Sequence, residues 1–457
     1  MIYLKVICLT KKTPISLHNL SVIQEFPTDF KFGVATSSYQ IEGNKNGDCG
    51  LSIWDDFARK KLNGIDGKEA CRHLDFFKED IKLIKDAGFK SYRFSFSWPR
   101  LFPEKNQKLN NLGLDFYNRL LDEIHKQELE PYPTLYHWDL PIRFQDQGGW
   151  TNKDTAKYFS DFALSIAEHF SDRYNKIATI NEPWCVSWLS HYLGEHAPGI
   201  KDLRSAAQAM HNVLYAHGLA LTALKSLSSS KVGIVLNNEY ASPYNEDTKN
   251  IDAANLFDAI YNRWFSDAIF LGQYPEIALE ILGKYLPPEY KEDLKVISTP
   301  IDWLGLNYYT RSIIKDHKSN DGINYKCLRG DLKKTDMDWE FYPQGLRYFI
   351  ERIHNEYNKK IPIYITENGM SNKDFLDKKN EITDEDRIEY FDLHLKEVLK
   401  CLNKGIPVKG YFAWSLMDNY EWSFGYEKRF GLVYVDYQSF KRIPKKSYYE
   451  FQKQLCV

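Results

Sequence analysis

The segments Thr179–Pro183 (TINEP) and Tyr364–Gly369 (YITENG) each place one glutamate directly after a short run of apolar and β-branched residues. Such runs are typical of buried parallel strands. Two carboxylates at the ends of two strands are what hydrolysis of a glycosidic bond requires, because one donates a proton to the leaving oxygen while the other stays ionised near the anomeric carbon. Glu182 and Glu367 are therefore the candidate catalytic pair.

Further strand-like runs surround these two segments, and helical patterns separate them. The eight strand candidates are Lys31–Gln40, Ser91–Phe96, Tyr132–His137, Lys176–Asn181, Val232–Asn237, Ile301–Tyr308, Pro362–Glu367 and Val408–Trp414. Between them, apolar residues at helical spacing, such as Phe77, Ile81 and Ile84, predict amphipathic helices. Repeated βα units favour a single (β/α)8 barrel of the TIM type with extended βα loops, since parallel strands need helical crossovers and closure removes both edges. An open doubly wound sheet is the alternative.

The composition describes a large chain with little charge bias. Its 457 residues are 43% hydrophobic, and 60 basic and 62 acidic residues leave a net charge of -2. This balance argues against nucleic acid or an anionic membrane surface as a partner and favours small neutral substrates. No apolar run approaches the roughly 20 residues of a membrane span. Because no linker divides the chain, we expect a leader over residues 1–25, ordered or disordered, and one catalytic barrel over residues 26–457.

The cysteines and the N-terminus favour a cytoplasmic protein. Seven scattered cysteines without a C-x-x-C pair predict neither a disulfide framework nor a zinc site. The apolar start Met1–Leu9 is interrupted by Lys5 and shows no small-residue cleavage site, so a signal peptide, and with it secretion, is the less favoured alternative.

Polar and aromatic residues gather at the predicted C-terminal ends of the strands, where active sites of such barrels are built. They are Gln40, His137, Trp138, Asp139, Asn181, Glu182, Asn307, Tyr309, Glu367 and Trp414. Taken singly, most have a structural explanation; Asn-Glu-Pro, for example, suits the first turn of a helix. Arg93, within the second strand, is different, because a buried guanidinium needs an anionic partner. Glu367 is the partner we expect.

Seven motifs follow one another in a fixed order along the chain. They are FPTDFKFGVATSSYQIEG (26–43), YRFSFSWPR (92–100), LYHWDLP (135–141), TINEP (179–183), LNYY (306–309), YITENG (364–369) and WSLMDNYEWSFGYEKRFG (414–431). Through this ordered set the sequence resembles glycoside hydrolase family 1, the β-glucosidase family, from about Phe26 to the C-terminal end. The resemblance implies a retaining β-glucosidase that acts on small β-glucosides or short oligosaccharides, tolerates β-galactosides and β-fucosides, and needs no metal or other cofactor.

The resemblance also implies distinct roles for the two glutamates. Glu182 would be the acid/base and Glu367 the nucleophile. Arg93 and Tyr309, with Asn307 as a further candidate, would keep Glu367 ionised, and Glu182 would keep its proton because it faces that charge. Retention predicts carboxyl groups about 5 to 5.5 Å apart. A transglycosidase with the same intermediate, or an inactive sugar-binding relative, are the alternatives.

Further motif positions would bind the sugar. The resemblance implies that the sugar hydroxyls are contacted by Gln40, His137, Asn181, Glu421 and Trp422, with Trp138 beside His137. It also implies that Trp414 lies under the sugar ring and that Trp339 lines the leaving-group side, unless Trp339 is a core residue. Members that cleave 6-phosphorylated sugars carry serine at the position of Glu421 and tyrosine at that of Phe430. The carboxylate at Glu421 therefore predicts an unphosphorylated sugar, since it would repel a phosphate and accept hydrogen bonds from hydroxyls.

Overall fold

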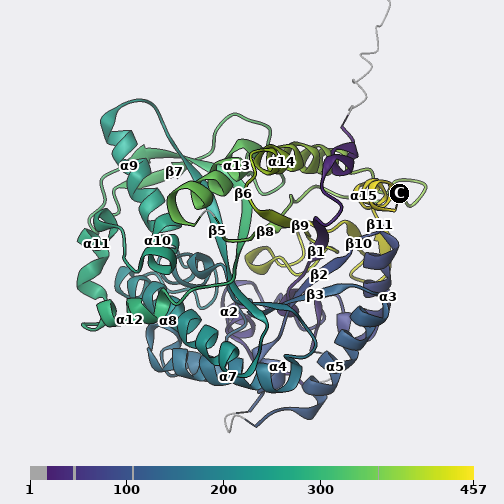
Figure 1. The fold of residues 1–457 in the computed structure, drawn as a ribbon, viewed down its shortest axis with the longest axis horizontal. Coiled ribbons are helices and arrows are strands. Elements are labelled where there is room, and N and C mark those ends of the chain that lie inside the picture. The colour runs from purple at the N-terminus through teal and green to yellow at the C-terminus, as the bar shows by residue number, and fades with distance from the viewer. Residues whose placement is uncertain (1–17, 45–47, 105–107, 359, 457) are drawn as a thin grey trace, which may run out of the picture.

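A closed barrel of parallel strands forms the centre of the molecule, with helices around it (Figure 1). The computed structural model describes residues 18–44, 48–104, 108–358 and 360–456. The barrel strands are β1 (Lys31–Ala35), β2 (Ser91–Ser95), β3 (Glu130–Tyr136), β4 (Lys176–Asn181), β5 (Lys231–Pro243), β6 (Trp303–Asp316), β8 (Ile363–Asn368) and β9 (Val408–Trp414). Each strand pairs in parallel with the next, β5 pairs with β6, and β9 pairs with β1. The predicted (β/α)8 barrel is confirmed, and the open doubly wound sheet is wrong.

The helices pack their apolar faces against the outside of the barrel. Eight of them are α3 (His73–Asp86), α5 (Asn111–Lys126), α7 (Asp154–Phe170), α8 (Leu203–Leu227), α9 (Thr248–Asp258), α10 (Trp264–Leu271), α13 (Pro343–Arg352) and α14 (Glu385–Asn403). The others are α1 (Ser38–Ile41), α2 (Ile53–Lys61), α4 (Trp98–Leu101), α6 (Ile142–Gln145), α11 (Glu276–Leu282), α12 (Tyr290–Ile297) and α15 (Lys446–Leu455). In α3 the residues Phe77, Ile81 and Ile84 are all buried, as their spacing predicts.

The C-terminal ends of three strands differ from the prediction by several residues. β1 ends at Ala35, so Gln40 does not close a strand but lies in α1, whose first amide, that of Ser38, donates a hydrogen bond to Ser95 Oγ. β5 and β6 run several residues past their predicted ends and pair with each other as far as Pro243 and Ile314. Tyr309, one residue past the predicted end of this strand, therefore lies within β6, as Asn307 does. The antiparallel strand β7 (Tyr325–Leu328) extends the sheet beside β6, and a separate hairpin joins β10 (Val433–Val435) to β11 (Arg442–Pro444).

The inside of the barrel is packed with side chains. Tyr132 of β3 contacts Phe412 of β9, with ring centroids 4.9 Å apart, and Trp303 lies 5.5 Å from Tyr364. A side chain at Gly33 would bring its Cβ within 2.6 Å of the Phe412 ring, which explains the glycine at this close approach. Because these aromatic rings fill the barrel, space for a ligand remains at the C-terminal ends of the strands.

The segment before the barrel is partly ordered. Residues Ser21–Glu25 form a short 3₁₀ helix that contacts α14 and α15, and Leu20, Val22 and Ile23 are buried there. The packed part of the chain thus begins before Phe26, the start we predict for the barrel. Met1–Leu9, on which the signal-peptide interpretation rests, lies outside the described residues.

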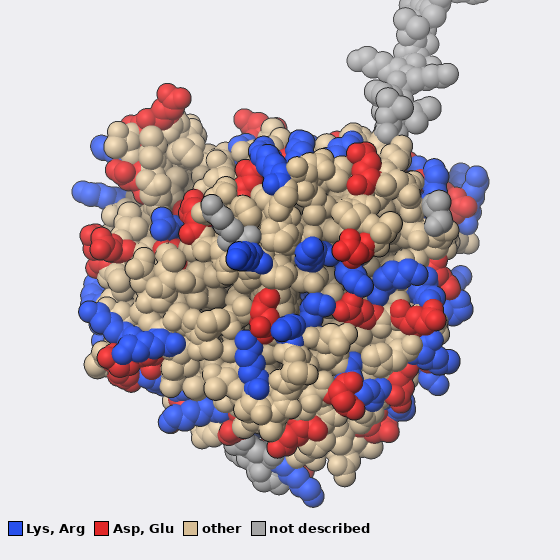
Figure 2. All heavy atoms as spheres, in the orientation of Figure 1, with Lys and Arg blue, Asp and Glu red and all other residues tan. Residues whose placement is uncertain are grey.

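The surface mixes charges of both signs. Figure 2 shows lysine and arginine interspersed with aspartate and glutamate over the face in view. Among the described residues, each helix is either too short or too polar to cross a membrane.

Candidate active site

A cavity of about 630 Å³ lies at the C-terminal ends of the barrel strands. Its walls include ten of the residues singled out from the sequence: His137, Trp138, Glu182, Tyr309, Trp339, Glu367, Trp414, Glu421, Trp422 and Phe430. Four others, Gln40, Arg93, Asn181 and Asn307, are fully or almost fully buried. Arg93, Asn181 and Asn307 contact one another or residues of the wall, whereas Gln40 is bonded to Ser37, Asn419 and Tyr420. The barrel thus brings both glutamates, far apart in sequence, into one site.

Glu367 is held by one cation and one hydroxyl group. Arg93 Nη1 donates to Glu367 Oε1 at 2.5 Å, and the hydroxyl of Tyr309 donates to Oε2 at 2.6 Å. Both partners reach the carboxylate because β2, β6 and β8 project these side chains toward the cavity. A guanidinium and a donated hydrogen bond stabilise an ionised carboxylate. The predicted Arg93–Glu367 pair is present and almost completely buried.

Glu182 is bonded to uncharged groups, the amide of Asn307 and the thiol of Cys185. It follows β4 directly, with φ of 52°, a left-handed conformation that is uncommon outside glycine and is found often at functional sites. Burial, and next the negative charge of Glu367, raise the pKa of Glu182 to about 8. At neutral pH this carboxyl therefore holds its proton, whereas Glu367 is paired with a cation.

Asn307 contacts a different glutamate from the one we predict. Its Nδ2 donates to Glu182 Oε1 at 2.7 Å and to Asn181 Oδ1 at 3.1 Å, whereas Glu367 is bonded to Arg93 and Tyr309. The amide is fixed in this orientation because its Oδ1 accepts a hydrogen bond from Thr366 Oγ1. Asn307 is thus a partner of Glu182.

Asn181 connects the two sides of the site. Its Oδ1 accepts from Arg93 Nη2 at 2.6 Å as well as from Asn307, and its Nδ2 lies 3.2 Å from His137 Nε2. Burial and the charge of Arg93 lower the pKa of His137 well below its usual range, so the imidazole is neutral. Its Nδ1 is buried without a hydrogen-bond partner, and the ring lines the cavity. A neutral donor facing the cavity suits a hydroxyl-rich ligand.

Glu421 contributes a third carboxyl group to the cavity. It lies in the loop after β9, and its Oε2 is buried without a hydrogen-bond partner. Burial, and then the charges of Glu367 and Glu182, raise the pKa of Glu421 to about 8. Because this atom has no partner within the protein, it is free to accept a hydrogen bond from a ligand in the cavity.

Gln40 is more enclosed than predicted. Its Nε2 donates to Asn419 Oδ1 and to the Tyr420 carbonyl oxygen, each at 2.9 Å, and its Oε1 accepts from Ser37 Oγ. Both amide protons are therefore used within the protein. These bonds hold the loop that leads directly to Glu421.

Aromatic rings enclose the site. Trp414 stacks on His137 at 5.8 Å, and Trp422 lies 4.6 Å from Trp138. Across the cavity, Trp339 lies 5.4 Å from the ring of Tyr309 and forms part of the wall, so it is not solely a core residue. Flat apolar faces between polar groups are typical of small-molecule sites.

The comparison with known proteins agrees with this geometry. A sequence model of glycosyl hydrolase family 1 matches residues 22–455. The chain belongs to this family. A relative named β-glucosidase A, from Thermotoga maritima, is 42% identical over 434 residues, covering 93% of this chain and 97% of the relative. A 6-phospho-β-galactosidase from Clostridium acetobutylicum is 37% identical, covering 94% and 97%.

Solved structures of family 1 enzymes share the fold. The family 1 β-glucosidase from Thermotoga maritima in complex with isofagomine lactam superposes with a TM-score of 0.91 at 42% identity, covering 94% of this chain and 98% of that one. The same enzyme with glucoimidazole gives a TM-score of 0.90. The predicted family resemblance is confirmed.

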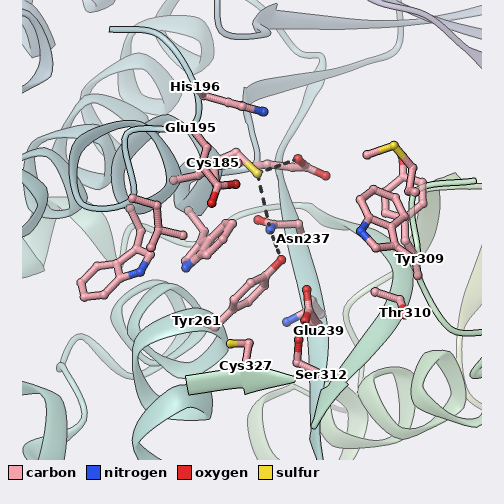
Figure 3. A pocket seen from close by; sticks show the side chains of 18 of the residues that line it. Cys185, Glu195, His196, Asn237, Glu239, Tyr261, Tyr309, Thr310, Ser312 and Cys327 are labelled. Atoms are coloured by element: carbon pink, nitrogen blue, oxygen red, sulfur yellow. Dashed lines mark hydrogen bonds between the residues drawn. The ribbon is translucent and has the colours of Figure 1, made fainter. Parts of the chain in front are cut away.

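Sequence reasoning missed the outer wall of this family 1 site. Figure 3 shows it, with Cys185, Asn237, Glu239 and Tyr261 on one side of the cavity and Tyr309 on the other. Asn237 and Glu239 lie two residues apart in β5, so their side chains point to the same face of the sheet. The predicted strand ends at Asn237, so this spacing does not identify Glu239 from the sequence. Among the described residues, no group of three or more His, Cys, Asp or Glu side chains is arranged to hold a metal ion.

Proposed function

We propose that the protein is a retaining β-glucosidase that removes terminal β-D-glucosyl residues from small glucosides or short oligosaccharides. The observation that carries the proposal is the unequal environment of two carboxyl groups in one cavity. Glu367 is paired with Arg93 and Tyr309, whereas burial and the neighbouring charge raise the pKa of Glu182 to about 8. At one pH, a carboxyl group with a raised pKa can act as an acid while an ionised carboxylate beside it acts as the nucleophile.

In the first step, the Glu367 carboxylate attacks the anomeric carbon. The bond from that carbon to the aglycone oxygen breaks, and Glu182 gives its proton to the departing oxygen. Asn307 remains bonded to Glu182 Oε1 and orients the carboxyl. The products of this step are the free aglycone and a glucosyl ester of Glu367.

In the second step, water replaces the aglycone. Esterification removes the negative charge of Glu367, which is the second cause of the raised pKa of Glu182, so Glu182 now acts as the base. It takes a proton from water while the water oxygen bonds to the anomeric carbon and the ester bond breaks. The configuration at the anomeric carbon is inverted in each step and is therefore retained overall.

The sugar proposed for the site is unphosphorylated glucose, with galactose and fucose also accepted. Support comes from Glu421, whose buried, unpartnered oxygen can accept a hydrogen bond from a sugar hydroxyl. A phosphate would add negative charge close to the Glu367 carboxylate in a buried site, where like charges repel strongly. For this reason we do not propose a phosphorylated sugar as the substrate, although one relative is named 6-phospho-β-galactosidase.

Two measurements test the proposal. The values of kcat/KM for aryl β-glucoside, β-galactoside, β-fucoside and 6-phospho-β-glucoside should rank the glucoside above the phosphorylated sugar. A preference for the phosphorylated substrate would refute the assignment of the sugar. Separately, proton NMR should detect β-glucose as the first product, and initial α-glucose would refute retention. For its location we propose the cytoplasm, which subcellular fractionation can test.

A further inference from the structure

Cys185 contacts the carboxyl group of Glu182 directly. It is the first residue of a π-helical turn, Cys185–Leu189, and its Sγ lies 3.2 Å from Glu182 Oε2. Such turns are often found at functional sites. The thiol is 7% exposed and forms part of the cavity wall (Figure 3). An ionised carboxylate can only accept, so the S–H group is the donor when Glu182 carries a charge.

A second contact fixes the direction of this thiol. Asn237 Nδ2 lies 3.7 Å from Cys185 Sγ and 2.9 Å from the hydroxyl of Tyr261. The sulfur accepts from the amide of Asn237, and its single proton is left for Glu182. Burial, and then the charge of Glu182, raise the pKa of Cys185 well above its usual range, so the proton stays on the sulfur.

The ionised form of Glu182 thus has one donor for each oxygen. Asn307 supplies the donor to Oε1 at 2.7 Å, and Cys185 supplies the donor to Oε2. Titratable and charged groups surround them. They are Glu367 of β8, Arg93 of β2, Tyr309 of β6, Tyr261 from the π-helical turn after α9, Glu421 from the loop after β9, and Glu239 of β5, whose charge acts on the thiol. Of these, Arg93 alone is a cation, and it is bonded to Glu367.

We propose that Cys185 is a positioning residue for the acid/base, and that its S–H group stabilises the ionised form of Glu182 which receives a proton from water in the second step. The inference rests on the proposed function, because it takes Glu182 as the acid/base. No bond to sulfur is made or broken. The thiol keeps its proton while Glu182 first gives one to the aglycone oxygen and later takes one from water.

The proposal predicts the direction of a pH effect. Removing a donor to the charged form raises the pKa of a carboxyl group. The basic limb of kcat/KM reports the acid/base in the free enzyme. Loss of the S–H donor should therefore move that limb to higher pH, by about 0.3 to 1 pH unit for one weak hydrogen bond.

The experiment compares donor and non-donor side chains at position 185. Cys185→Ala and Cys185→Val lack a donor, whereas Cys185→Ser keeps one. Cys401→Ala, in a buried part of α14 away from the cavity, is the matched control for loss of a buried thiol. Profiles of kcat/KM against pH are recorded with phenyl β-glucoside, whose poor leaving group needs the acid. We expect the limb to move upward in the alanine and valine variants and to stay close to that of the wild type in the serine and control variants.

The proposal would be overturned if the basic limb of kcat/KM in either folded non-donor variant coincided with that of the wild type. It would also be overturned if this limb moved by the same amount in the serine variant as in the non-donor variants. Should one non-donor variant not fold, the other carries the comparison. Failure of the proposed function has a different signature. If Glu182→Gln hydrolysed phenyl β-glucoside as fast as wild type, Glu182 would not be the acid/base at all, whatever the behaviour of Cys185.

Discussion

Replacing Glu182 with glutamine removes the proton donor with little change of shape. The amide oxygen of the new side chain can still accept the hydrogen bond that Asn307 donates to Glu182 Oε1 at 2.7 Å. Arg93 and Tyr309, which hold Glu367, are not touched by the change. The variant therefore isolates the proton transfer from the binding of the sugar.

The size of the effect depends on the leaving group. General acid catalysis contributes about 10²- to 10⁴-fold, so kcat/KM for phenyl β-glucoside should fall by that factor. An activated aryl glucoside such as the 2,4-dinitrophenyl compound needs no proton, so its first step should be nearly unchanged. With a pKa of about 8, Glu182 is protonated in about ten molecules for each ionised one at pH 7. The wild type should lose activity above pH 8, and the variant should lack this basic limb.

The assay is steady-state kinetics from pH 5 to 10 with both substrates. Azide added to Glu182→Gln should restore turnover of the activated substrate and give β-glucosyl azide, because a small anion needs no base. Glu123→Gln, a buried glutamate on α5 away from the cavity, is the matched control and should behave as wild type. Equal losses on both substrates, or a basic limb that persists in Glu182→Gln, would refute the reasoning.

Three further predictions concern the same site and its support. Tyr309→Phe removes a charge-assisted hydrogen bond of 2.6 Å to the nucleophile, so kcat should fall about 10- to 100-fold with the fold intact by circular dichroism, and an unchanged kcat would contradict this. Glu421 has a pKa raised to about 8, so its contribution to stability is present below about pH 4 and is lost as the pH rises to 8. Glu421→Gln should therefore flatten the fall of Tm between pH 5 and 8, and parallel Tm curves would contradict this. Lys445 pairs with Asp374 and Asp418 at 2.6 Å, and the side chains of all three are fully buried, so Lys445→Met should destabilise the fold by about 3 to 5 kcal/mol, measured as a lower Tm at a fixed scan rate. A Tm equal to that of the wild type would contradict this last expectation.

The sequence predicts the architecture well because hydrophobic periodicity and strand-end chemistry agree. All eight predicted strands exist, and Arg93 pairs with Glu367 as the cost of a buried guanidinium requires. The glycine of YITENG also has a physical reason, since a Cβ at Gly369 would lie 1.9 Å from the carbonyl oxygen of Trp414. These features can be predicted because they depend on local sequence patterns or on the need of a buried charge for a partner of opposite charge.

The remainder depends on side-chain directions that a sequence does not contain. Asn307 could have faced either glutamate, and its hydrogen bond from Thr366 decides for Glu182. The largely apolar run from Lys31 predicts that Gln40 ends a strand, yet β1 ends at Ala35 and Gln40 lies in α1. Cys185 follows TINEP closely but showed no pattern of its own, because its contact depends on the π-helical turn.

The central claim is that Glu367 forms the covalent intermediate while Glu182 moves the proton. It is tested most directly by inactivating the enzyme with a 2-deoxy-2-fluoro-β-glucoside bearing an activated leaving group, which slows release of the ester, and by locating the label with peptide mass spectrometry. We predict one 2-fluoroglucosyl group on Glu367, within the peptide that contains YITENG. A label on Glu182 or on any other residue would contradict the assignment.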